Sequence, residues 1–273
     1  MKTAVTICLV PEARQGPFVL HGGAEDLAAH CRTAAELGFD GVEIFPASGE
    51  AFPAAALAGL LRGHGLALAA VGTGAGFLKH GLHVCHEDPA VRERAIAFIE
   101  RIVDAAGSLG APAIVGSMQG RSGGEVSREA ALDHLAAALH RLGERADRHG
   151  QVLLYEPLNR YETNLFNRQG EAAAFLDARG LGPVKLLCDL FHMNIEEASP
   201  GHALEAAGPR VGHIHWADSN RRAIGFGHTD PRPIVAALRR IGYAGFLSAE
   251  ILPLPTPLDA ARQSVAGARA AIA

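Results

Sequence analysis

The chain has 273 residues, 48% of them hydrophobic, which is enough to bury a large core in either two small domains or one α/β barrel. Its formal net charge is −4, and its basic residues form no run longer than a pair, which excludes the basic surface of a nucleic-acid-binding or anionic-membrane-binding protein. No apolar segment approaches the roughly 20 residues needed to span a membrane.

The four cysteines are widely spaced and form no CxxC motif, which argues against a disulfide framework or a zinc knuckle. The N-terminal stretch MKTAVTICLV is followed by Pro11, Glu12 and Arg14 rather than by the longer apolar region of a signal peptide. We therefore expect reduced thiols, a cytoplasmic location and a first strand at this end of the chain.

Short apolar runs alternate with longer helical segments in the first half of the chain. The helices are predicted from apolar spacing and from N-cap signals, such as Asp88 followed by Pro89, and Ser127. The strands of this half are expected over Thr3–Val10, Phe39–Phe45, Leu66–Val71 and Ala111–Ser117. Its helices are expected over Ala24–Leu37, Pro53–His64, Asp88 to about Leu109, and Ser127 to about His149.

The second half repeats the same alternation. Its strands read QVLLYE, VKLLCD, VGHIHW and GFLSAE. Its helices are expected over Gln169–Ala178, Pro200–Ala207, Pro231–Ile241 and Leu258–Ile272. Strands and helices thus alternate strictly, without a linker of shifted composition, and the count of eight strands favours a closed barrel over an open sheet. The sequence predicts the α/β class and one (β/α)₈ TIM-barrel domain over residues 1–273.

Four polar residues end the last four predicted strands, at the edge where a TIM barrel places its chemistry. They are Glu156, Asp189, His215 and Glu250, each roughly one βα unit from the next. Three carboxylates facing one point would repel one another, and a divalent cation would remove that conflict. The oxygen-rich donor set favours manganese, with magnesium or cobalt as alternatives. Any one of these residues taken alone could instead form an ion pair or cap a helix.

Other histidines and a glycine-rich stretch near the predicted mouth are not expected to bind a metal or a dinucleotide. His213 is expected to point to the opposite face of its strand from His215, toward the helices, as a buried core histidine. The three histidines between residues 80 and 86 lie in a long polar loop, for which a solvent-facing or lid role is favoured over metal binding. The stretch Gly72–Gly76 lacks the glycine spacing and the directly following helix of a dinucleotide-binding loop, so it is expected to let backbone approach a small ligand.

Several stretches resemble the sugar isomerase and epimerase family of xylose isomerase-like barrels. They are YEPLNRYETN (155–164), CDLFHMNIEE (188–197), HIHWADSNRRAIGFGHTD (213–230) and SAEILPLP (248–255). Within that family the chain is most similar to the ketose 3-epimerases and the 5-keto-L-gluconate epimerase type, and the segment 72–96 extends the similarity. The resemblance covers most of the chain and implies a dimer or tetramer, as is frequent in the family.

The resemblance also implies roles for individual residues. The metal ligands it implies are Glu156, Asp189, His215 and Glu250, the same four that end the strands. The groups that would hold the carbonyl and hydroxyl end of a sugar are Glu162, His192 and Arg221. Two positions depart from the family pattern: Asp218 stands where several ketose 3-epimerases have glutamate, and Trp216 is larger than the residue often found there.

The implied activity is metal-dependent epimerisation at carbon 3 of a small ketose or keto-aldonate, through an enediolate. Inversion needs two bases on opposite faces, and we expect Glu156 and Glu250 to supply them. The expected partner is a small keto-sugar, with no nucleic acid and no membrane. Three alternatives stay open: an aldose–ketose isomerase of the hydroxypyruvate or inosose type, a DNA-repair endonuclease, and a sugar-binding protein without catalysis.

Overall fold

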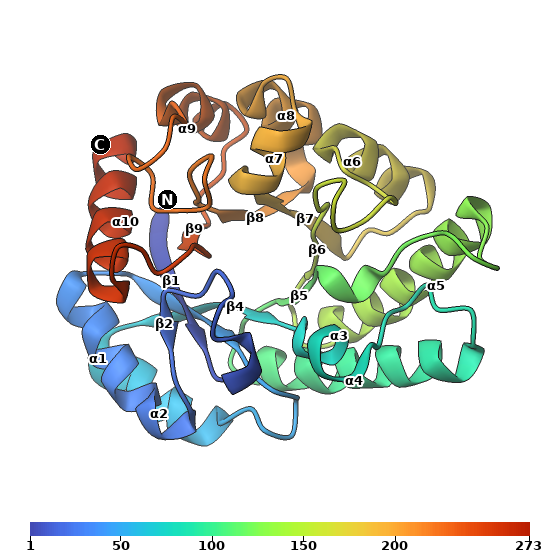
Figure 1. Cartoon of the computed structure of the whole chain (residues 1–273), viewed down its shortest axis with the longest axis horizontal. Coiled ribbons are helices and arrows are strands. Elements are labelled where there is room, and N and C mark those ends of the chain that lie inside the picture. The colour runs from blue at the N-terminus through green and yellow to red at the C-terminus, as the bar shows by residue number, and fades with distance from the viewer.

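The apolar runs form a parallel sheet that closes on itself because its first and last barrel strands pair through residues 2–5 and 246–249. Figure 1 shows the ring of strands with helices outside it, in the computed structural model, which describes residues 1–273. The barrel strands are β1 (Lys2–Cys8), β3 (Gly41–Phe45), β4 (Ala67–Gly72), β5 (Ala113–Val115), β6 (Leu153–Tyr155), β7 (Val184–Asp189), β8 (Val211–His215) and β9 (Phe246–Ala249). The predicted TIM barrel is confirmed.

The helices begin where the sequence supplies caps. Asp88 accepts a hydrogen bond from Ala90 N at 2.8 Å and Ser127 accepts one from Ala130 N at 3.1 Å, so both predicted N-caps are present. The helices are α1 (Leu27–Leu37), α2 (Ala54–His64), α3 (Ala75–His80), α4 (Pro89–Gly107), α5 (Arg128–Asp147), α6 (Gln169–Ala178), α7 (Leu190–Glu196), α8 (Pro200–Ala207), α9 (Pro231–Arg240) and α10 (Pro257–Ile272). None of them combines the length and apolar character needed to cross a membrane.

Three regular elements had no counterpart among the expected ones. Strand β2 (Leu20–His21) pairs with Ile7 and Cys8 of β1, beyond the residues that β9 reaches. Helices α3 and α7 directly follow β4 and β7, and each is too short to show a clear apolar period. The expectation that no helix directly follows Gly72–Gly76 was therefore wrong. Short 3₁₀ turns complete the chain: η1 (Pro11–Ala13), η2 (Ala24–Asp26), η3 (Ser117–Gln119) and η4 (Gly208–Arg210).

The barrel interior below the mouth has an apolar side and a polar side. On β4 to β7 a small apolar cluster, separate from the core under the helices, contains Ala70, Ile114, Leu154 and Leu187. Leu187 is the register partner of His213 on β8, so the two residues lie at the same level of the barrel. His213 is hydrogen-bonded to Glu43 of β3. The polar side thus lies directly beneath the ends of the strands that carry the predicted site.

Candidate active site

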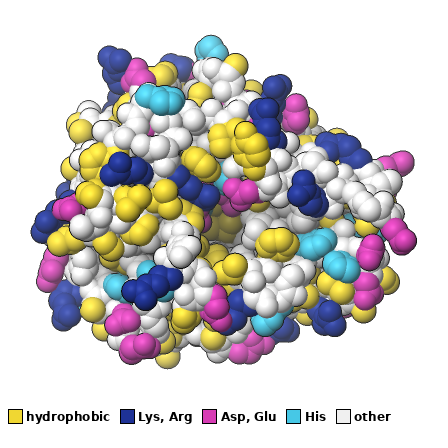
Figure 2. All heavy atoms as spheres, in the orientation of Figure 1, with side chains coloured by type: hydrophobic (Ala, Val, Ile, Leu, Met, Phe, Trp, Pro, Cys, Tyr) yellow, Lys and Arg dark blue, Asp and Glu magenta, His cyan; other side chains and the backbone are white.

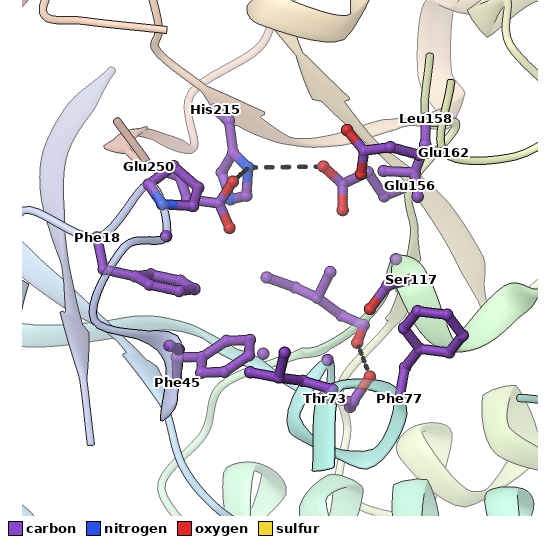
Figure 3. Close-up of a pocket in the computed structure, with 18 of the residues that line it drawn as sticks. Phe18, Phe45, Thr73, Phe77, Ser117, Glu156, Leu158, Glu162, His215 and Glu250 are labelled. Carbon is purple, nitrogen blue, oxygen red and sulfur yellow. Dashed lines mark hydrogen bonds and ion pairs between the residues drawn. The ribbon is translucent and has the colours of Figure 1, made fainter. Parts of the chain in front are cut away.

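The carboxyl ends of β6 to β9 bring four donor side chains together. Asp189 and His215 are the last residues of β7 and β8, while Glu156 and Glu250 follow β6 and β9 directly. From His215 Nδ1, the distances are 3.4 Å to Asp189 Oδ2, 3.6 Å to Glu250 Oε2 and 3.7 Å to Glu156 Oε1. Figure 3 shows Glu250 and Glu156 on opposite sides of His215. The four residues predicted as metal ligands therefore converge on one point.

The two carboxylate oxygens of Asp189 have different roles, one in capping a helix and one in the candidate site. Its Oδ1 accepts a hydrogen bond from Phe191 N at 2.7 Å and so caps α7. Its Oδ2 faces His215 Nδ1. The helix cap that the sequence left open as an alternative is present, yet it uses only one oxygen and leaves the other for the site.

His213 and His215 point to the same side of β8, into the barrel. The Nε2 atom of His213 lies 2.9 Å from Glu43 Oε2, and that of His215 lies 3.1 Å from Glu43 Oε1. The expectation that His213 faces the helices was wrong, because residues two apart along a strand share a face. The interpretation of His213 as a buried, hydrogen-bonded histidine holds, but its partner is a carboxylate inside the barrel.

The three site carboxylates strongly disfavour one another's charge. Burial, together with the charges of Glu250 and Asp189, raises the pKa of Glu156 well above its usual value. Burial likewise raises the pKa of Glu250. Burial opposes ionisation of Asp189 too, but the neighbouring imidazoles of His192 and His215 hold its pKa below the usual range. A doubly charged cation between these groups would relieve the repulsion.

A divalent cation fits the donor atoms present. Two overlapping sets have their donor atoms within 4.8 Å of one another: Glu156, Asp189 and His192, and Asp189, His215 and Glu250. Carboxylate oxygens with one imidazole nitrogen suit manganese, magnesium or cobalt, and no thiolate is part of either set. The four cysteines are buried, free thiols, and none of them belongs to these sets. The buried acidic and histidine groups are thus compatible with a bound divalent metal.

His192 is held by Asn159 in one tautomer. The Nδ1 atom of His192 faces two donors of Asn159, the backbone N at 3.3 Å and the side-chain Nδ2 at 2.8 Å. Because a backbone N–H can only donate, Nδ1 must accept, and the proton lies on Nε2. That Nε2 lies 3.8 Å from both Glu156 Oε1 and Asp189 Oδ2. His192 therefore presents an N–H donor to the centre, and burial lowers its pKa, which favours the neutral ring.

Glu162 and Arg221 complete the polar side of the cavity. Asn159 Nδ2 also donates to Glu162 Oε1 at 3.0 Å, so one amide positions both His192 and Glu162. Arg221 Nη2 donates to Glu250 Oε2 at 2.7 Å, and its guanidinium stacks 4.8 Å above the Phe191 ring. The backbone of Arg221 has a φ of 57°, a left-handed conformation that a residue other than glycine seldom adopts outside functional sites.

The site opens into a cavity of about 470 Å³ at the barrel mouth, within the range of about 300–1,000 Å³ typical of small-molecule sites. Figure 2 shows the hollow near the centre of this face. Opposite the polar groups, Figure 3 shows Phe18, Phe45 and Phe77. Glu12 of η1 and Lys79 of α3 form an ion pair, 3.2 Å from Oε1 to Nζ, that joins two segments of this apolar side.

The other residues and loops singled out from the sequence lie outside the donor sets. Asp218 accepts hydrogen bonds from the backbone of Ser219, Gly225, Gly227 and Thr229, so it shapes its own loop. Trp216 is buried and does not line the cavity. The histidines between residues 80 and 86 form no set of three metal-donor atoms, whereas Gly72 and Gly74 do line the cavity, as expected for backbone close to a small ligand.

The chain matches the model of the xylose isomerase-like TIM barrel family over residues 31–270, and it belongs to this family. It is 33% identical over 232 residues to the D-psicose 3-epimerase of Agrobacterium fabrum, an alignment that covers 82% of this chain and 79% of that protein. It is 31% identical over 227 residues to the ketose 3-epimerase of Arthrobacter globiformis, covering 82% and 77%. The resemblance inferred from the sequence motifs is thereby confirmed.

A solved structure agrees with these relatives. The D-allulose 3-epimerase from Methylomonas sp. in complex with D-allulose superposes with a TM-score of 0.83 at 25% identity, over 99% of this chain and 96% of that one. The relatives are carbohydrate epimerases, which confirms the predicted enzyme class, an isomerase acting on carbohydrates.

Sequence reasoning missed three residues that position the site. Glu43 bonds both histidines of β8, Asn159 orients His192, and Gly116 leaves room for Glu156 because a Cβ there would overlap Glu156 Oε2. Only Glu43 carried a readable signal, as a single carboxylate in the otherwise apolar strand GVEIF. The other two depend on contacts between segments far apart in the chain.

Proposed function

We propose that this protein is a divalent-metal-dependent epimerase that inverts carbon 3 of a small, neutral ketose through an enediolate. The observation that carries the proposal is the approach of Glu156, Asp189 and Glu250 oxygens to within 3.4–3.7 Å of one imidazole nitrogen, that of His215. Relatives with 31–33% identity that act as ketose 3-epimerases support the same reaction for this chain.

The residues that would hold the ion are Glu156, Asp189, His215 and Glu250. Manganese is the first choice, and magnesium or cobalt would suit the same donors. When bound, the ion supplies Lewis-acid stabilisation of the negative charge that develops on the sugar's oxygens as the carbon-3 proton leaves.

Glu156 and Glu250 are the proposed bases. They come from β6 and β9 and lie on opposite sides of His215, as Figure 3 shows. A sugar placed between them presents one face of carbon 3 to each carboxylate. One glutamate removes the proton from its face, and the other delivers a proton to the opposite face, which inverts the carbon. In the reverse direction the two glutamates exchange roles.

Three further groups would hold the sugar in a fixed position and orientation. His192 donates from Nε2–H to a sugar oxygen, Arg221 donates from its guanidinium, and Glu162 accepts from a hydroxyl. Arg221 is the sole Arg or Lys among the cavity-lining residues, and Glu250 already engages it. A phosphate or carboxylate on the substrate would meet no unpaired Arg or Lys side chain there, which favours a neutral ketose over a keto-aldonate.

Solvent labelling tests the reaction directly. Incubated with D-psicose in deuterium oxide, the manganese-loaded enzyme should form the carbon-3 epimer with deuterium at carbon 3 and none at carbon 1, as read by proton NMR. Label at carbon 1 would instead indicate an aldose–ketose isomerase. Saturable binding of the sugar without any label would indicate a sugar-binding protein, and either result would overturn the proposal.

A further inference from the structure

A buried carboxylate lies directly beneath the proposed metal site and touches two histidines at once. Glu43 belongs to β3, whereas His213 and His215 belong to β8, and β1 and β9 separate these strands in the sheet. The contact therefore crosses the barrel interior. The exposed fractions are 4% for Glu43, 2% for His213 and 1% for His215, so these hydrogen bonds are largely shielded from bulk water.

The hydrogen bonds fix which nitrogen of His215 faces the site. An ionised carboxylate can only accept, so Nε2 of each histidine must carry a proton where it meets Glu43, at 2.9 Å for His213 and 3.1 Å for His215. The nitrogen of His215 left for a cation is then Nδ1, the atom that lies 3.4–3.7 Å from the three site carboxylates. The opposite tautomer would set a nitrogen lone pair against a carboxylate oxygen.

His213 binds the second oxygen of Glu43 and so holds that carboxylate in place. Glu43 has two oxygens, and each histidine takes one of them. The neighbour of His213 at the same level on β7 is Leu187, which offers no hydrogen-bond donor. Without His213, one oxygen of Glu43 would be buried without a partner, and the carboxylate would be free to rotate away from His215.

We propose that Glu43 and His213 act as a buried clamp that fixes the tautomer and orientation of His215, so that Nδ1 is presented to the divalent ion. Glu43 and His213 are thus positioning residues that act through His215; His213 lies outside the cavity lining, and Glu43 borders the cavity with only 4% of its surface exposed. This inference rests on the proposed metal-dependent function and adds the residues that set up its histidine ligand.

A second cation site is the rival explanation for the same cluster. The donor atoms of Glu43, His213 and His215 lie within 4.8 Å of one another. A cation there would need lone pairs on both Nε2 atoms, but these atoms already lie at hydrogen-bonding distance from the two oxygens of Glu43. The rival predicts two bound ions per chain, whereas the clamp predicts one.

Calorimetric titration of the metal-free protein with manganese separates these explanations. Wild type should bind one ion, and Glu43→Gln should bind one ion about 10- to 100-fold more weakly, the usual effect of losing an outer-shell partner. His213→Leu should weaken binding similarly, and His213→Gln, which keeps an N–H donor, should restore much of the affinity. The control is Asp40→Asn, which removes a carboxylate that bonds Thr3 just before β3 and should leave manganese affinity unchanged.

Nitrogen-15 NMR of the histidine rings gives a second readout. In the metal-free wild type, the neutral form of His215 should be protonated at Nε2 only, and in Glu43→Gln the neutral form should populate both tautomers. Unchanged affinity and an unchanged tautomer in Glu43→Gln would overturn the clamp while the proposed function stands, and two ions in wild type would overturn it as well.

If wild type binds no ion, the proposed function fails. The NMR spectra of the metal-free protein then test only the hydrogen-bonded arrangement of Glu43, His213 and His215. Slowly exchanging Nε2–H signals from both His213 and His215, at least one of them lost in Glu43→Gln, would support it. Their absence from wild type would refute it.

Discussion

The two sides of the barrel mouth are built from the same repeating unit but differ in chemistry. The ends of β6 to β9 carry Glu156, Asp189, His215 and Glu250, whereas the end of β3 and the segments after β1 and β4 carry aromatic rings. On the apolar side, the rings of Phe18 and Phe45 pack with centroids 4.5 Å apart. Under the proposed function, one half of the barrel would supply the reacting groups, and the other half would shape the cavity and keep water out.

The two sides also differ in how their side chains are held. Three of the polar groups are fixed by a hydrogen bond with a residue outside the proposed donor set: His215 with Glu43, His192 with Asn159, and Asp189 with Phe191 N. The apolar side is held by packing, and its outermost ring, that of Phe77, is 45% exposed. Changes to the polar side should therefore reduce turnover, and changes to the apolar side should mainly alter substrate affinity.

Metal removal should reduce the rate of epimerisation most, because it removes the charge stabilisation that the polar side of the mouth is proposed to supply. Dialysis against a chelator is expected to reduce epimerisation of D-psicose to the level of buffer, since the carbon-3 proton is too weakly acidic without charge stabilisation. Added manganese should restore the rate, and circular dichroism should show that the barrel stays folded throughout. Full activity in the chelated protein would remove the need for a cation.

Neutralising either proposed base should give the next largest effect. Glu156→Gln and Glu250→Gln each keep an oxygen that can face the ion but lose the proton acceptor, so kcat should fall about 10²- to 10⁴-fold. Metal content should be measured on the same samples, to separate lost proton transfer from lost metal. The matched control is Glu205→Gln, which alters an ion pair with Arg240 on the outer helices and should leave kcat unchanged. Normal turnover in both site variants would refute the two-base scheme.

A single methyl group added beside Glu156 should lower kcat by displacing the carboxylate of that residue. In Gly116→Ala the new Cβ would overlap Glu156 Oε2 and push that carboxylate aside, and a misplacement of about 1 Å can cost about 10²-fold in rate. Gly59→Ala is the matched control, because a Cβ at Gly59 meets nothing within 4 Å. Its kcat should equal that of wild type. If both variants turn over equally fast, the position of Glu156 is not critical.

Truncation on the apolar side should give the smallest effect. Phe77→Ala removes a half-exposed ring, so KM is expected to rise by about fivefold, which corresponds to about 1 kcal/mol of lost contact. Its kcat and its free energy of unfolding should change little, the latter by about 0.5 kcal/mol or less. Steady-state kinetics and thermal melts provide the check. A hundredfold loss of kcat would contradict the assignment of turnover to the polar side and of substrate affinity to the apolar side.

Much of the barrel was predictable because its signals are local. The helix Gln169–Ala178 and the strand Val184–Asp189 have the predicted bounds, since apolar spacing and flanking turns define them within a few residues. Strand ends were predictable enough to bring Glu156 and Glu250 to one mouth, because parallel strands in a closed barrel all end at the same edge.

The missed features depend on long-range contacts or on very short elements. Helix α7 has only seven residues, and the cap that starts it is Asp189, a residue whose position at a strand end had pointed to the site instead. Asn159 acquires its role only when His192, far along the chain, folds against it. The orientation of His213 was a different kind of miss, since strand periodicity alone places it on the same side as His215.

Anomalous diffraction from crystals grown with manganese would test the central claim most directly. The proposed mechanism predicts one strong peak per chain at the manganese edge, within bonding distance of Glu156, Asp189, His215 Nδ1 and Glu250. A peak elsewhere, or none at saturating manganese in an active preparation, would contradict a metal-assisted epimerisation at this site.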